Sequence, residues 1–104
     1  MSSIPRIAIE HASRHDGQTV EIAGWLYNLR RSGKIIFPLL RDGTGIMQCV
    51  AVKANISEKC FNDLRDLTQE SAVIVRGRVR AESRAPGGYE LDVEDAEIVH
   101  RISE

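Results

Sequence analysis

The side chains best suited to bind a ligand in this sequence are an aromatic ring, an amide and several cations. Phe37 lies in the stretch KIIFPLLRDG, Gln48 follows in the next apolar stretch, and the preceding loop contains Arg30 and Lys34. An aromatic ring can stack on a nucleobase, cations bind phosphates, and an amide offers a base edge both a donor and an acceptor. This set indicates single-stranded nucleic acid. The same residues also fit a core phenylalanine and an ordinary surface glutamine, so the pattern alone leaves both interpretations open.

No group of residues indicates catalysis. The sequence has no nucleophile motif, no GxGxxG fingerprint and no P-loop. The tetrapeptide DGTG at residues 42–45 resembles an aspartic-protease signature, but between two strands a hairpin turn explains it better. Cys49, Cys60 and the scattered histidines do not have the spacing of metal ligands. We therefore expect a chain that is not an enzyme by itself and that binds no metal or cofactor.

The charges are balanced in total but unevenly distributed. The 104 residues carry a formal net charge of −1. Basic residues gather in residues 27–53 and 76–84, whereas residues 90–97 are acidic. A local basic patch can attract a polyanion even when the net charge is near zero, although such charges also occur simply as solvated strand faces. With no membrane-length apolar run and no signal peptide in the sequence, we expect a cytoplasmic protein.

The spacing of apolar residues predicts five short strands and one helix. The strands are expected over residues 20–26, 34–41, 46–53, 71–82 and 89–94. Ser57 should cap a short amphipathic helix that ends near Asp66. Because short strands avoid exposed edges by closing on one another, this order predicts an OB-fold. The expected fold class is all-β: a five-stranded closed Greek-key barrel with the helix between strands three and four.

We expect residues 1–104 to form one OB-fold domain, with residues 1–17 as an N-terminal extension that packs on the barrel. Alternation along the second strand places Ile36, Pro38 and Leu40 inside and Phe37 outside. OB-folds bind their ligands on the outer face of strands two and three, between two loops. Phe37 and Gln48 therefore lie on the expected binding face.

Three segments of the sequence resemble a known family. They are VEIAGWLYNLRRSGKIIFPLLRDGTGIMQCVAVK, SAVIVRGRVRAE and RAPGGYEL, at residues 20–53, 71–82 and 84–91. In this order they resemble the N-terminal anticodon-binding domain of class IIb aminoacyl-tRNA synthetases. The APGGYE loop is most similar to the asparaginyl branch, with the aspartyl branch next. The resemblance covers essentially the whole chain and implies the same OB-fold.

The resemblance also implies roles for particular residues. Phe37 occupies the position of the aromatic residue that stacks on the central anticodon uridine, and Gln48 that of the glutamine that hydrogen-bonds the same base. Arg30 corresponds to the arginine of the first loop that contacts the anticodon. The basic patch and the expected location of the first and third anticodon bases add six residues to the tRNA-binding set: Lys34, Arg76, Arg78, Arg84, Gly87 and Gly88. The implied partner is tRNA, first that for asparagine and next that for aspartate, and no membrane is involved.

The family's full-length enzymes continue into a catalytic domain that uses ATP and magnesium, and they are homodimers. We therefore expect this chain to be an excised part of an ATP-dependent ligase, monomeric or weakly dimeric when isolated. Two other interpretations remain: a general single-strand binder, and a protein-interaction or dimerisation barrel.

Pro38 departs from the family, which usually has Leu, Ile or Val there. Because proline has no N–H, we expect either a lost ladder hydrogen bond or a bulge that could rotate Phe37.

Overall fold

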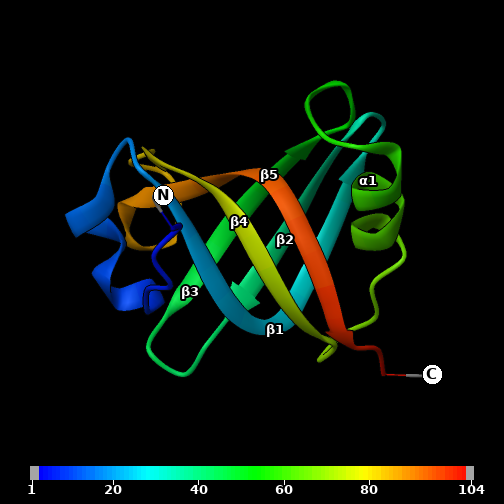
Figure 1. The fold of residues 1–104 in the computed structure, drawn as a ribbon, viewed down its shortest axis with the longest axis horizontal. Helices are drawn as coiled ribbons and strands as arrows, with labels where there is room; N and C mark the ends of the chain where they lie inside the picture. The colour runs from blue at the N-terminus through cyan, green and yellow to red at the C-terminus, as the bar shows by residue number, and fades with distance from the viewer. Residues whose placement is uncertain (1–2, 103–104) are drawn as a thin grey trace.

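The computed structural model describes residues 3–102 (Figure 1). Five curved strands surround one core, and along the strands buried side chains largely alternate with more exposed ones. The strands are β1 (Thr19–Ser32), β2 (Ile35–Arg41), β3 (Ile46–Val52), β4 (Ala72–Ala81) and β5 (Tyr89–His100). They close in the order β1-β2-β3-β5-β4, with β3 and β5 parallel and the other neighbours antiparallel. The predicted five-stranded OB-fold barrel is confirmed.

The inward face of each strand was largely predictable from its alternation. Val73, Val75 and Val79 are buried on β4, as the alternation of residues 71–82 indicates, and Gly77 lies between Val75 and Val79. Gly77 has a steric reason to lack a side chain, because a Cβ there would lie 2.3 Å from the backbone oxygen of Asp92 on β5. The close approach of two backbones therefore requires glycine at this position.

Two strands extend beyond their predicted ends. The first was expected over residues 20–26, but β1 continues to Ser32 through a shift in register between Leu26 and Asn28. Such a bulge lets one long strand bend and pair with β4 along its first half and with β2 along its second. The last strand, expected over residues 89–94, continues to His100 because its second half also pairs with β4.

Pro38 does not disturb the register of β2. It lies opposite Leu29 of β1, and on the other side the pairs Ile36–Ala51 and Leu39–Gln48 keep one register across it. Of the two outcomes expected at Pro38, the bulge is therefore not found, and the lost ladder hydrogen bond stays a prediction. The ring of Pro38 is almost fully buried, and Phe37 beside it keeps its outward direction.

Short helices cover the barrel at opposite ends (Figure 1). The helix α1 (Glu58–Arg65) follows the short turn η2 (Lys53–Asn55) and packs against β2 and β5. Ser57 caps α1 as predicted, since its hydroxyl accepts a hydrogen bond from the N–H of Cys60 at 3.0 Å. Among residues 3–102, no helix is long and apolar enough to cross a membrane.

The N-terminal segment forms a 3-10 helix, η1 (Ile9–His15), and contributes Ile9 and Ala12 to the core. Asp42 joins this segment to the turn between β2 and β3. Its Oδ2 accepts the backbone N–H of Ile9 at 2.8 Å, and its Oδ1 accepts the N–H and hydroxyl of Thr44 at 2.8 and 2.7 Å. Burial raises the pKa of Asp42, but the hydrogen bonds from Ile9, Thr44 and Gly45 together hold it below its ordinary value of 3.8.

We predict that Asp42→Asn lowers the free energy of unfolding by about 1–3 kcal/mol at neutral pH, because an amide cannot accept hydrogen bonds on both sides. The folded-state pKa of Asp42 is depressed. Its contribution to stability is therefore complete above the unfolded-state pKa and is lost as pH falls through the folded-state pKa. Urea unfolding from neutral to acidic pH should show a smaller acid-induced loss of stability in the variant. Equal pH dependence in both proteins would contradict this role.

Candidate nucleic-acid interface

A groove of about 510 Å³ runs over the outer surface of β2 and β3 toward the loop between β4 and β5. Its lining combines an aromatic ring, an amide, cations and two acids: Arg30, Ile35, Phe37, Gln48, Val50, Arg80, Glu82, Arg84, Ala85 and Glu90. Four residues predicted from sequence to form the site therefore line one groove: Arg30, Phe37, Gln48 and Arg84.

Phe37 lies on the outer face of β2, partly exposed, as the alternation predicted. Arg30 is directly opposite it on β1, and the guanidinium carbon of Arg30 lies 4.5 Å from the centre of the Phe37 ring. That distance is within the range of a cation–π contact. The interpretation of Phe37 as a core residue is therefore wrong, and the ring is accessible from the groove.

The amide of Gln48 is fixed by an acid on the neighbouring strand. Gln48 and Glu90 are paired between β3 and β5, and the Gln48 Nε2 donates to Glu90 Oε2 at 2.6 Å. The other carboxylate oxygen of Glu90 accepts from Arg80 Nη2 at 2.7 Å. Because an ionised carboxylate only accepts hydrogen bonds, the amide nitrogen of Gln48 must face Glu90. The carbonyl oxygen of Gln48 is thereby left to accept from a ligand.

The three arginines of the groove differ in how strongly they are held. Arg80 binds both Asp92 and Glu90, and these hydrogen bonds raise its pKa. Arg84 donates to Glu82 at 2.8 Å, which raises the pKa of Arg84 and lowers that of Glu82. Arg30 forms no ion pair and donates no side-chain hydrogen bond to any of residues 3–102. It is therefore the groove cation most able to bind a phosphate.

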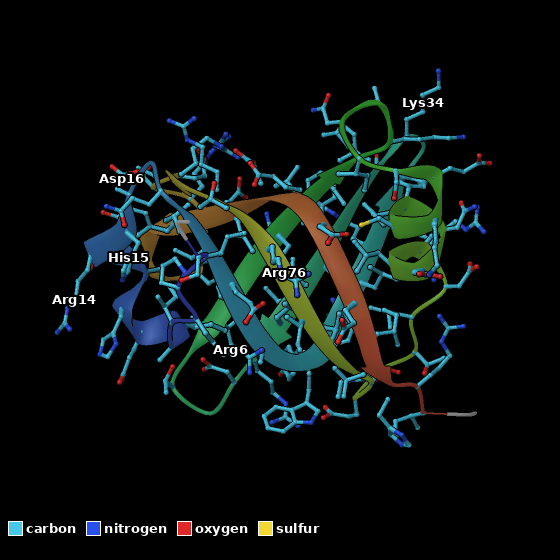
Figure 2. All side chains as sticks on the ribbon, in the orientation of Figure 1. Arg6, Arg14, His15, Asp16, Lys34 and Arg76 are labelled. Carbon is cyan, nitrogen blue, oxygen red and sulfur yellow. The ribbon has the colours of Figure 1, made fainter. Side chains whose placement is uncertain are left out.

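The other predicted residues lie outside the groove lining. Lys34 is exposed at the tip of the β1–β2 hairpin (Figure 2). Gly87 and Gly88 form the turn η3 (Pro86–Gly88) with φ angles of 71° and 82°. Their contacts with tRNA remain predictions.

Arg76 and Arg78 also lie away from the groove. Arg76 is held by Glu21 at 3.0 Å and by Asp95 at 3.1 Å, on the face of the barrel that carries Arg6 (Figure 2). Arg78 is exposed, and its guanidinium is close to Gly17. Neither lines the groove, although both share the outward face of β4 with Arg80, so a role in tRNA binding remains a prediction for each.

Three polar groove residues were missed by the sequence-based prediction: Arg80, Glu82 and Glu90. The alternation along β4 is the signal that could have found Arg80, because it places this arginine on the outer face of the strand. Glu90 was not singled out among the acids of residues 90–97, whereas only 8% of it is exposed in the structure. Its burial follows from the parallel contact of β5 with β3, and no local pattern reveals a contact between strands that are not consecutive.

A closed five-stranded barrel with an aromatic residue, a fixed amide and cations in one outer groove defines an OB-fold of the nucleic-acid-binding class. A family model described as the tRNA anticodon OB-fold nucleic acid binding domain matches residues 20–99. The chain belongs to this family.

This chain is also similar to part of several longer proteins. The asparagine–tRNA ligase of Koribacter versatilis is 56% identical over 104 residues, covering all of this chain and 24% of that protein. That of Thermus thermophilus is 48% identical over 96 residues, covering 92% of this chain and 22% of that protein. The crystal structure of asparaginyl-tRNA synthetase from Pyrococcus horikoshii complexed with asparaginyl-adenylate has a TM-score of 0.89 at 42% identity, covering 98% of this chain and 24% of that one. The chain thus spans about a quarter of the length of these relatives.

We predict that Glu90→Ala releases the Gln48 side chain, because the amide then loses its acceptor. NMR relaxation of the Gln48 side-chain NH2 group should report greater mobility, and the free energy of unfolding should fall by about 1–3 kcal/mol as Arg80 also loses a partner. Glu97→Ala, an exposed acid on the same strand, removes the same charge and is the control. If the two variants leave the Gln48 amide equally ordered, Glu90 does not position it.

Proposed function

We propose that this chain is the anticodon-binding domain of an asparagine–tRNA ligase and that the groove holds the central uridine of the anticodon. The observation that carries this proposal is the presence of an accessible Phe37 ring and a Gln48 amide fixed by Glu90 in one groove. Family membership and the similar asparagine–tRNA ligases support the choice of RNA and of amino-acid branch.

The two side chains supply different parts of the recognition. A uracil ring lying flat on Phe37 gains stacking energy of about 1–3 kcal/mol, and any base would gain some of it. The carbonyl of Gln48 adds selectivity, because it can accept from the imide N–H of uracil, whereas cytosine presents an acceptor at the same ring position. Arg30 supplies a positive charge for the adjoining phosphate. Phe37 therefore provides affinity and Gln48 provides discrimination.

The remainder of such a ligase would perform the chemistry. In this proposal the chain supplies no catalytic residue, ATP and magnesium bind in a separate catalytic domain, and the full enzyme is a homodimer. Recognition by this domain affects catalysis only by positioning the tRNA. Substitutions in the groove should therefore raise the KM for tRNA more than they change the rate of amino-acid activation.

We predict that Phe37→Ala weakens binding of a uridine-centred anticodon stem-loop by about 1–3 kcal/mol, because one stacked base loses its partner. Gln48→Ala should instead reduce the preference for uridine over cytidine at the central position by about 1–3 kcal/mol, the value of a specific base contact. Fluorescence titrations with both RNAs measure these effects. Trp25→Ala is the matched control, since this aromatic residue is 42% exposed and lies outside the groove.

The same titrations separate this proposal from a general single-strand binder. A general binder should show no preference between the two central bases and should lose affinity steeply with added salt. Equal binding of both stem-loops by the wild-type domain, or a homopolymer that competes as well as the uridine-centred loop, would contradict anticodon recognition.

A further inference from the structure

The guanidinium of Arg30 lies over one face of the Phe37 ring, which is otherwise partly exposed in the groove. The guanidinium carbon lies 4.5 Å from the centre of the Phe37 ring, and the pairing of Arg30 with Phe37 between β1 and β2 holds the two side chains together on one face of the sheet. A base that stacks on this same face of the ring would occupy the space directly above it. The guanidinium and a stacked base cannot both occupy that space.

In the part of the chain that the structure describes, no hydrogen bond or ion pair holds the side chain of Arg30 in this position. Among residues 3–102 it has no acidic partner, whereas Arg80 and Arg84 in the same groove are bound to Glu90 and Glu82. Moving the Arg30 guanidinium therefore breaks its cation–π contact but no ion pair, while moving either of the others would break an ion pair. Arg30 is exposed, so its long side chain has room to swing toward solvent.

We propose that Arg30 is a movable cover: in the free protein its guanidinium lies on Phe37, and an entering base displaces it so that the guanidinium binds an RNA phosphate. This inference rests on the proposed function and concerns the regulation of the same site. A base stacks on an aromatic ring more strongly than an exposed guanidinium does, so the exchange favours the complex. The released cation then gains a charge-assisted hydrogen bond to phosphate.

The proposal predicts opposite effects of Arg30→Ala on two RNAs. One is a uridine-centred anticodon stem-loop, and the other is the same RNA with uncharged methylphosphonates in place of the phosphates flanking that uridine. The variant should bind the natural loop about ten-fold more weakly, because a charged hydrogen bond is lost. It should bind the uncharged loop about two- to five-fold more tightly, because no cation–π contact has to be broken.

Arg14→Ala is the control for net charge. Arg14 is an exposed arginine on η1, at the opposite end of the molecule from Lys34 and the β1–β2 hairpin (Figure 2). It should change the affinity for both RNAs equally and only slightly. If Arg30→Ala weakens binding of the uncharged loop or leaves it unchanged, Arg30 is not a cover.

An NMR measurement separates failure of this proposal from failure of the proposed function. Nuclear Overhauser contacts between the Arg30 side chain and the Phe37 ring should be present in the free domain and disappear on addition of the natural loop. Their absence from the free domain would overturn the cover even if RNA binds, and so would their persistence in the complex. If the wild-type domain does not distinguish uridine from cytidine, the proposed function fails whatever Arg30 does.

Discussion

The parallel pairing of β3 with β5 is the contact on which the groove depends. It closes the barrel, and it also places Glu90 beside Gln48, residues that are far apart in the sequence. The carboxylate of Glu90 then accepts from Gln48 on one side and from Arg80 on the other. One feature of the topology therefore both completes the fold and orients the amide that we propose reads a base.

The charges of the groove follow from the same arrangement. Glu90 and Asp92 neutralise Arg80, and Glu82 binds Arg84, so most of the positive charge in the groove is already compensated. Only Arg30 remains without an acidic partner among the described residues of the groove. Such a site should bind RNA through one ring, one amide and one cation rather than through a broad basic surface. That composition favours discrimination between bases over general attraction to polyanions.

Local patterns predicted more of the fold than of the groove. Alternation with a period of two correctly separated Phe37 from Pro38, because the direction of a side chain in a strand depends only on its neighbours in sequence. The cap at Ser57 was equally local. The length of β1 was not predictable in this way, because it depends on a bulge between Leu26 and Asn28 that no residue type in the sequence indicates. The burial of Glu90 depends on a partner strand, and Arg76 shares its outward direction with Arg80 although the two lie in different parts of the surface.

The most direct test of base recognition by Phe37 and Gln48 is a crystal structure of this domain bound to a uridine-centred anticodon stem-loop. We expect the central uracil to lie flat on Phe37 and its imide N–H to donate to the carbonyl oxygen of Gln48, with Glu90 still accepting from the amide nitrogen. A complex in which the RNA leaves the Phe37 ring unstacked, or in which Gln48 faces away from the base, would contradict recognition by these two residues.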